Sequence, residues 1–286
     1  MSERTLLLGL IGDDISLSRT PPMHEAEGMA QGLPTIYRRL DTLSPGLRDR
    51  PLAEVLHAAR DLGFDGLNIT HPHKRAVVGL LDEIDDDVRR LGAANTVVIR
   101  ADGALIGHNT DVSGFRRGFL DGLSGVTTET VLQIGTGGAG TAVASALVSM
   151  GVGQLLVSDL DPQHAQELVD SLNLAAGRAA ARALPPQQVA EILPGCDGVV
   201  NATPMGMSAH PGTSFDTAVL EPRQWVAEIV YMPLRTQLLE EAEARGCRVL
   251  DGGRMAVFQA VDAFRHFTGL EPDPQRMRET FLSISA

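Results

Sequence analysis

The sequence has few cysteines, no excess of positive charge and no long uninterrupted hydrophobic run. Its 286 residues include only Cys196 and Cys247, which are too few and too far apart for a disulfide framework or a cysteine metal motif. Such cysteines are typical of a protein that stays reduced in the cytoplasm. The formal net charge is −12, and a surface of that sign argues against nucleic acid or an anionic membrane as a partner.

The hydrophobic segments are short or interrupted, so the sequence predicts neither a signal peptide nor a membrane span. Leu6–Ile11 is a short apolar run that predicts a first strand. Thr130–Ser158 contains no charged residue and is long enough to cross a bilayer, but six glycines break it into strand, turn, helix and strand. We therefore expect this segment to be the buried start of a globular fold.

What the sequence does contain is a glycine-rich turn after an apolar strand. Gly135, Gly137 and Gly140 match the pattern G-x-G-x-x-G. Glycines there permit a tight turn and a close approach of the backbone to a pyrophosphate, and the third lets the following helix pack against the strand. The helix expected at about 139–150 directs its free N–H groups at the phosphates. The predicted pyrophosphate-binding residues are Gly135, Gly137, Gly138, Ala139 and Gly140.

An acidic residue follows this turn at the spacing of a ribose ligand. Asp159 ends a second apolar run, 19 residues after Gly140. A carboxylate there accepts hydrogen bonds from the ribose of NAD and repels the 2′-phosphate of NADP. The stretch after it has no lysine or arginine, and its one potential cation is His164, a residue type that is mostly uncharged at neutral pH. We predict NAD as the cofactor, with NADP less favoured, and Asp161 as the N-cap of the next helix.

Strand and helix patterns alternate on both sides of the glycine turn. Before it, strands are expected at 6–11, 35–40 and 66–69, helices at 23–31, 51–62 and 74–81, and a hairpin at 95–100 and 104–108. After it, strands are expected at 131–134, 155–158, 198–201, 225–230 and 248–251, and helices at 238–244, 254–267 and 272–282. The alanine- and arginine-rich stretch 175–184 is expected to be a surface helix and turn.

These patterns predict the α/β fold class with two domains. An N-terminal α/β substrate-binding (catalytic) domain is expected to comprise residues 1–111 with 253–286. A doubly wound, Rossmann-type NAD-binding domain is expected at 112–252, with a cleft between the two domains.

Polar residues gather at the strand ends of the front domain. They are Ser18, Thr20, Thr70, Lys74, Asn95 and Asp111. Strand ends on one side of a sheet converge in space, so we expect these groups to face one pocket. Hydroxyls, an amide, an ammonium and a carboxylate together suit a small ligand that carries several hydroxyls and a carboxylate.

These residues, in this order, resemble those of the shikimate/quinate dehydrogenase family, and the resemblance covers essentially the whole chain. It implies that Ser18 and Thr20 hold the substrate carboxylate and that Lys74 and Asp111 are the catalytic pair. The residues implied to hold the ring hydroxyls are Thr70, Lys74, Asn95, Asp111 and Gln259. Tyr231 matches a further pocket position of the family.

The resemblance also extends the predicted cofactor site. The run Asn201–Met207 resembles the nicotinamide-side loop of the family. Besides the glycine turn and Asp159, the predicted cofactor-binding residues are His164, Thr203, Pro204, Met205, Met207, Val230 and Gly253.

Three departures from the biosynthetic members of the family set the expected reaction. Thr20 stands where those enzymes usually have serine, Arg254 stands where they often have glycine, and Asp159–Asp161 replaces an Asn-Arg-Thr-like run. All three resemble the NAD-dependent quinate/shikimate dehydrogenases of quinate catabolism. The expected activity is reversible oxidation of quinate to 3-dehydroquinate and of shikimate to 3-dehydroshikimate. The alternatives are an NADP-dependent shikimate dehydrogenase of aromatic amino acid biosynthesis and a non-catalytic NAD-sensing protein.

The expected chemistry needs a group that takes the hydroxyl proton when the hydride leaves. A lysine is mostly protonated at neutral pH, and a neighbouring carboxylate stabilises that charged form further. With Lys74 as the base and Asp111 beside it, alcohol oxidation should rise with pH above neutrality. We also weigh simpler roles: Lys74 as a surface lysine at a helix start, and Asp111 as the cap of a helix at 112–119.

Other polar residues have simpler explanations open beside the functional ones. Ser18 and Thr20 could be turn residues, and Arg254 could contact the ligand or form an ion pair. His71 and His73 lack further ligands at metal spacing, so no metal is expected. His24 and Glu25 are expected to support the helix after Pro22, and the protein is expected to be a monomer or a homodimer.

Overall fold

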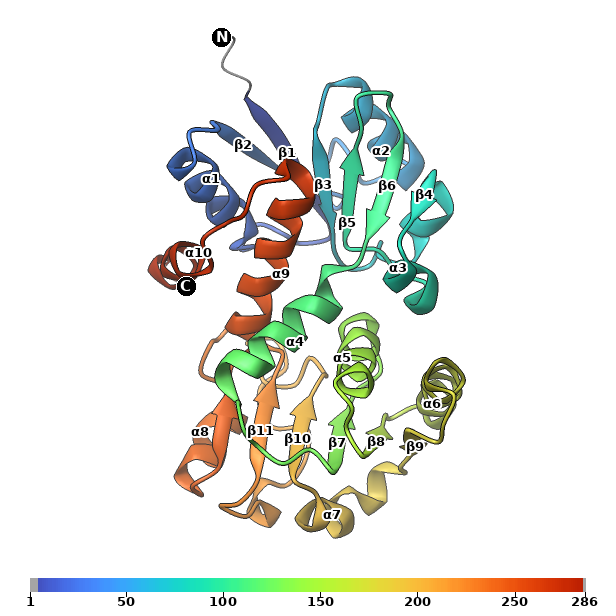
Figure 1. The fold of residues 1–286 in the computed structure, drawn as a ribbon, viewed down its shortest axis with the longest axis vertical. Coiled ribbons are helices and arrows are strands. Elements are labelled where there is room, and N and C mark those ends of the chain that lie inside the picture. The colour runs from blue at the N-terminus through green and yellow to red at the C-terminus, as the bar shows by residue number, and fades with distance from the viewer. Residues whose placement is uncertain (1–4, 285–286) are drawn as a thin grey trace. The chain divides into compact units, whose positions relative to one another are not determined.

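The computed structural model describes residues 5–284, which form two compact units. Unit 1 comprises the chain up to Thr110 together with the segment from Val257 onward, and unit 2 comprises Asp111–Ala256. The chain therefore leaves unit 1 at the start of helix α4 (Thr110–Gly122) and returns within helix α9 (Gly252–Thr268). Each unit contains one six-stranded sheet (Figure 1).

The sheet of unit 1 is mixed. Its strands, in spatial order, are β2 (Thr35–Asp41), β1 (Leu6–Gly12), β3 (Gly66–Ile69), β5 (Thr96–Ile99), β6 (Leu105–His108) and β4 (Glu83–Ile84). Strand β1 pairs in parallel with β2 and β3, whereas β5 runs antiparallel to both β3 and β6. The helices wholly within this unit are α1 (Thr20–Ala30), α2 (Leu52–Asp61), α3 (Asp86–Leu91) and α10 (Pro274–Ser283).

Strand β1 is apolar throughout because the sheet of unit 1 is covered on both faces. Leu6, Leu8 and Leu10 pack in one hydrophobic cluster with Phe267 of α9, whereas Ile11 lies in a second cluster with residues of α2 and β3. Alternate side chains of a strand point to opposite faces, so both clusters need apolar residues from the same strand.

The sheet of unit 2 is entirely parallel. Its strands, in spatial order, are β12 (Arg248–Leu250), β11 (Trp225–Glu228), β10 (Gly198–Asn201), β7 (Thr130–Ile134), β8 (Gln154–Ser158) and β9 (Ala181–Ala183). The helices between its strands are α5 (Gly138–Ser149), α6 (Pro162–Ala176), α7 (Val189–Ile192) and α8 (Gln237–Ala244). The chain moves outward from β7 in one direction and then from β10 in the other, which is the doubly wound order. The predicted fold class is confirmed.

Three local predictions were wrong. The stretch 74–81 is a turn followed by the 3₁₀ helix η1 (Ala76–Leu80), because adjacent valines and Gly79 disfavour an α-helix. The stretch 175–184 is not a helix and turn: α6 ends at Ala176, and the chain then enters β9. Helix α4 starts at Thr110, so Asp111 lies in its first turn and is not its cap.

Among the described residues, none of the helices combines the length and apolar character that a membrane span requires.

Two short elements had no clear signal in the sequence. Strand β4 has two residues and helix α3 has six, so neither is long enough to show a periodic pattern.

Candidate functional site

The glycine turn has the geometry that its sequence predicts. Gly135 has φ of +100°, and a Cβ added there would lie 2.6 Å from the carbonyl oxygen of Ala202. A Cβ on Gly140 would lie 2.4 Å from the carbonyl oxygen of Gly135, so this glycine lets α5 pack against the turn itself. A Cβ on Gly137 would meet no atom within 4 Å. The backbone at Gly137 is therefore open to a ligand, as a pyrophosphate cradle requires.

The side chain of a buried glutamine holds this turn in place by hydrogen bonds. Gln133 in β7 has no exposed surface, and its Nε2 donates hydrogen bonds of 2.8 Å to the carbonyl oxygens of Gly135 and Gly140. Sequence analysis did not select it. The signal was present, since Gln133 is a single amide in the apolar run Val131–Ile134.

Asp159 follows β8 and is bound to the glycine turn. Its Oδ2 accepts hydrogen bonds from the backbone N–H (2.8 Å) and the Oγ1 (2.7 Å) of Thr136, and its Oδ1 accepts one from the N–H of Asp161 (3.0 Å). Burial raises the pKa of Asp159, but these hydrogen bonds outweigh burial and lower the pKa below its ordinary value. The carboxylate is therefore ionised at neutral pH and fixed beside the turn.

Two polar residues at the start of α6 lie close to Asp159 in the sequence. Asp161 is the N-cap of α6, and its side chain accepts a hydrogen bond of 2.9 Å from the N–H of Gln163, which confirms the predicted cap. His164 is exposed, and its Nδ1 lies 3.8 Å from Oδ2 of Asp161.

The other predicted cofactor residues lie at the same edge of the unit 2 sheet. Thr203 follows β10 and borders the glycine turn, because a Cβ on Gly135 would lie 2.9 Å from its Cγ2. Val230 follows β11 and lies next to the start of α9, because a Cβ on Gly252 would lie 2.5 Å from its carbonyl oxygen. These are the carboxyl ends of parallel strands, where doubly wound sheets bind their ligands. The structure thus brings the glycine turn, Asp159, the Asn201–Met207 loop, Val230 and Gly253 to one edge.

In unit 1, the predicted carboxylate-binding residues lie at the start of α1. Ser18 and Thr20 are partly exposed, and Oγ of Ser18 accepts a hydrogen bond of 3.3 Å from the N–H of Thr20. Arg19 points away from this position, because its guanidinium donates to the carbonyl oxygen of Phe281 (3.2 Å) and lies over the Phe281 ring. An anion at this point would therefore meet two hydroxyls without a cation from Arg19. Because Pro21 and Pro22 have no N–H groups, the first turn of α1 adds few backbone donors.

The turn that carries Thr70 and Lys74 is tied to β1 and β2. His73 Nε2 lies 3.0 Å from Oγ1 of Thr42 and 3.6 Å from the carboxylate of Asp13. The backbone N–H of Ala94 donates to the carbonyl oxygen of Lys74 at 2.8 Å. These contacts fix the backbone on which the half-buried Lys74 side chain is carried.

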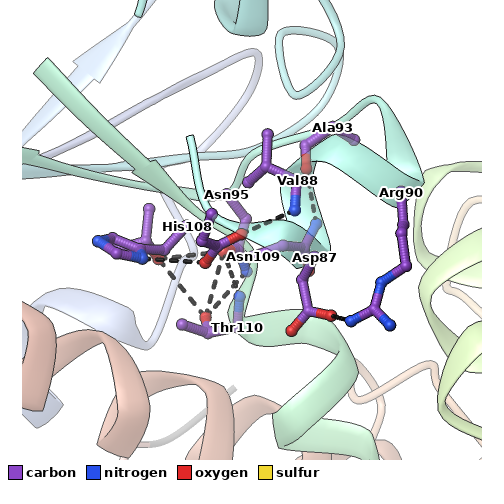
Figure 2. A network of polar contacts seen from close by, with 10 residues as sticks. Asp87, Val88, Arg90, Ala93, Asn95, His108, Asn109 and Thr110 are labelled. Carbon is purple, nitrogen blue, oxygen red and sulfur yellow. Dashed lines mark hydrogen bonds and ion pairs between the residues drawn. The ribbon is translucent and has the colours of Figure 1, made fainter. Parts of the chain in front are cut away.

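Asn95 is held by Thr110, the last residue of the first segment of unit 1 (Figure 2). Its Oδ1 accepts a hydrogen bond of 2.8 Å from the N–H of Thr110, and its Nδ2 donates one of 3.0 Å to Oγ1 of Thr110. Thr96 also donates from Oγ1 to Oδ1 of Asn95 at 3.0 Å. Thr96 and Thr110 belong to the polar strand ends visible in the sequence, but their role in orienting Asn95 was not predicted.

The remaining predictions are placed as follows. Unit 1 also contains Gln259, which is partly buried in α9, whereas Asp111 (2% exposed) and the partly buried Tyr231 belong to unit 2. Arg254 forms an ion pair with Asp121, which is the second of the two roles considered for it. Over residues 5–284, no group of three or more His, Cys, Asp or Glu side chains is arranged to hold a metal ion.

Comparison with known proteins shows the family of this chain. The family model for the shikimate dehydrogenase substrate binding domain matches residues 10–97. A relative from Corynebacterium efficiens named quinate/shikimate dehydrogenase (NAD(+)) is 61% identical over 284 residues, which are 99% of this chain and 100% of that protein. One from Pseudarthrobacter chlorophenolicus named shikimate dehydrogenase (NADP(+)) is 52% identical over 288 residues, covering 100% of this chain and 98% of that protein.

A solved structure shows the same fold. It is described as quinate dehydrogenase from Corynebacterium glutamicum in complex with NAD, and it matches with a TM-score of 0.96 at 56% identity, over 98% of this chain and 100% of that chain. The family predicted from the sequence is confirmed. The chain belongs to the shikimate/quinate dehydrogenase family of oxidoreductases.

Proposed function

We propose that the protein catalyses the reversible, NAD-dependent oxidation of quinate to 3-dehydroquinate and of shikimate to 3-dehydroshikimate. The observation that carries the choice of cofactor is the carboxylate of Asp159, which three hydrogen bonds hold beside the glycine turn. A fixed, ionised carboxylate there accepts from ribose hydroxyls and repels a 2′-phosphate. Overall similarity does not separate the cofactors, because relatives named for NAD and for NADP are 61% and 52% identical to this chain.

The residues of unit 2 fit NAD. The open space at Gly137 and the N-terminus of α5 suit the pyrophosphate, Asp159 suits the adenosine ribose, and the Asn201–Met207 loop suits the nicotinamide. The further cofactor contacts we propose are Gly138, Ala139, His164, Val230 and Gly253. When bound, NAD supplies the acceptor for the hydride.

Polar side chains supply the proposed substrate contacts. The hydroxyls of Ser18 and Thr20, at the start of α1, bind the carboxylate of quinate or shikimate. The ring hydroxyls are bound by Thr70, Asn95, Tyr231 and Gln259, together with the catalytic pair.

Lys74 and Asp111 handle the proton. Lys74 takes the proton from the reacting hydroxyl during oxidation and returns it in the reverse direction, and Asp111 orients the ammonium and stabilises its charge. Because a lysine must lose a proton before it acts as a base, oxidation should accelerate as pH rises above neutrality. A rate that stays flat from about pH 7 to 10, with chemistry rate-limiting, would argue against Lys74 as the base.

One assay separates this function from its alternatives: the specificity constants for quinate and shikimate, each with NAD and with NADP. We expect turnover of both substrates with NAD, with NADP disfavoured roughly tenfold or more by repulsion from Asp159. A preference for NADP would favour a biosynthetic shikimate dehydrogenase. No turnover in any combination would favour an NAD-sensing protein.

We also propose a cytoplasmic location and a monomeric or homodimeric state. The two buried, unpaired cysteines, Cys196 and Cys247, support a reducing compartment. Analytical ultracentrifugation of the purified protein would determine the oligomeric state.

A further inference from the structure

A buried carboxylate lies next to the loop that we assign to the nicotinamide. Glu228 is the last residue of β11, is 2% exposed, and pairs in the sheet with Asn201, the last residue of β10. Asn201 Nδ2 donates to both carboxylate oxygens, at 2.9 and 3.0 Å. The N–H of Val230 donates to Oε1 at 3.0 Å, and Oγ1 of Thr236 donates to Oε2 at 3.2 Å.

These hydrogen bonds continue into the Asn201–Met207 loop. Asn201 Nδ2 also donates to the carbonyl oxygen of Met205 at 3.0 Å, and its Oδ1 accepts from Oγ1 of Thr203 at 2.7 Å. Gly206, with φ of +101°, brings the loop back over the carboxylate, because a Cβ there would lie 3.5 Å from Oε2 of Glu228. Glu228 thus holds the loop through Asn201, and it also holds Val230, which belongs to a second predicted cofactor segment.

When the Glu228 carboxylate is ionised, no cation in the described part of the chain balances its charge. Within residues 5–284 it forms no ion pair, and its hydrogen-bond donors are an amide, a hydroxyl and backbone N–H groups. Burial raises its pKa to about 7, although those hydrogen bonds act in the opposite direction. A carboxylate removed from water without a cationic partner is costly, and a cationic ligand nearby would reduce that cost.

We propose that Glu228 is a positioning residue for the oxidised cofactor, which holds the Asn201–Met207 loop in shape and favours the cationic nicotinamide of NAD⁺ over the neutral ring of NADH. The inference rests on the proposed function, because that function places the nicotinamide at this loop. Attraction between the carboxylate and the ring acts through a buried, low-dielectric region, so it does not require direct contact. The nicotinamide ring of NADH is uncharged, so the ordered shape of the loop is the only contribution of Glu228 to NADH affinity.

The test is the pair of dissociation constants for NAD⁺ and NADH without substrate, measured by calorimetry and by NADH fluorescence at about pH 8.5, where the Glu228 carboxylate is ionised. We expect Glu228→Gln to raise the dissociation constant for NAD⁺ several-fold more than that for NADH. The matched control is Glu191→Gln, which removes one exposed carboxylate from α7 of the same unit and should change neither constant. Equal weakening of both cofactors by Glu228→Gln would overturn the proposal, because loop shape alone would explain it.

Melting temperatures of the free variants show whether each one folds. If Glu228→Gln does not fold, Thr236→Val removes one donor to the carboxylate with little change in side-chain volume, and it also removes the N-cap of α8. It should weaken NAD⁺ more than NADH, and equal weakening would again overturn the proposal. Failure of the wild-type protein to bind NAD⁺ or to oxidise either substrate would contradict the proposed function instead, so the two failures are distinguishable.

Discussion

In unit 2, the residues proposed to bind the cofactor are defined mainly by the backbone, whereas in unit 1 the residues proposed to bind the substrate are defined by their side chains. Gly135 and Gly140 act through the absence of a Cβ, since an added atom would lie within 2.6 Å of a carbonyl oxygen in each case. Asn95, by contrast, is oriented by side-chain hydrogen bonds with Thr96 and Thr110. A backbone site tolerates changes in chemistry but not in volume, and a side-chain site has the opposite sensitivity.

The largest expected effect is the loss of turnover when Lys74, the proposed base in unit 1, is removed. Lys74→Ala should lower turnover by roughly 10²- to 10⁴-fold, the usual contribution of a general acid or base, with little change in NAD affinity. Steady-state kinetics and NAD titration measure the two quantities. The matched control is Arg75→Ala, which removes the exposed neighbouring cation and should leave turnover unchanged. Turnover within a factor of a few of wild type would contradict the role of Lys74.

The backbone side of the comparison is tested by two glycine variants. Gly135→Ala should destabilise the protein by about 1–3 kcal/mol and weaken NAD, because an alanine at φ of +100° is strained and its Cβ meets Ala202. Gly137→Ala should leave stability almost unchanged but still weaken NAD, because its Cβ enters the open space that we assign to the pyrophosphate. Thermal unfolding and NAD titration separate the two outcomes. Unchanged NAD binding in Gly137→Ala would contradict the proposed pyrophosphate position.

A buried histidine in unit 1 makes stability depend on pH. His24 lies among Tyr37, Phe264 and Phe267 without a hydrogen-bond partner in the described part of the chain, and burial lowers its pKa from 6.5 to about 3. Below pH 6.5 the His24 imidazole binds a proton in the unfolded chain but stays neutral in the folded protein. The free energy of unfolding therefore decreases as pH falls from 6.5 towards 3.

His24→Phe should remove this loss. The difference in unfolding free energy between the variant and the wild-type protein should favour the variant by about 2 kcal/mol more at pH 5 than at pH 7.5. Urea unfolding at the two pH values measures the difference. His57→Phe, at an exposed position on α2, is the control and should show no such shift.

The smallest expected effect concerns Thr20. Quinate differs from shikimate by its C1 hydroxyl and saturated ring, and we propose that the Thr20 hydroxyl bonds that C1 hydroxyl. Thr20→Val, which keeps the shape, should lower the quinate-to-shikimate ratio of kcat/KM by about three- to tenfold, the value of one hydrogen bond. Thr20→Ser should change the ratio by less, since serine supplies the same atom. An unchanged ratio in both variants would exclude this hydrogen bond.

Sequence patterns predicted the elements that are long or carry a local chemical signal. Strand β10 has the predicted bounds, and Asp161 caps α6 as its position before Pro162 indicates. The stretch 175–184 was misassigned because three strand residues beside β8 have no periodicity of their own, so their conformation depends on the neighbouring strand.

Residues that act through distant partners could be listed from the sequence but not given a role. Arg254 pairs with Asp121, which is 133 positions earlier, and only the fold brings the two together. Gln133 and Glu228 were visible as polar residues in apolar strands. Glu228 binds Asn201 at the neighbouring strand end, which follows from the strand order of the sheet. Gln133 instead binds the carbonyl oxygens of Gly135 and Gly140 in the turn that follows its own strand.

The discontinuity of unit 1 has a consequence for synthesis on the ribosome. Unit 2 is continuous from Asp111 to Ala256, so all of its strands have been made before the second part of unit 1 emerges. Phe267 of α9, which covers the face of the sheet that carries Leu6, Leu8 and Leu10, is synthesised only after unit 2. One apolar face of β1 therefore lacks the cover of α9 until the last part of the chain is made, and exposed apolar surface of this kind favours aggregation before folding is complete.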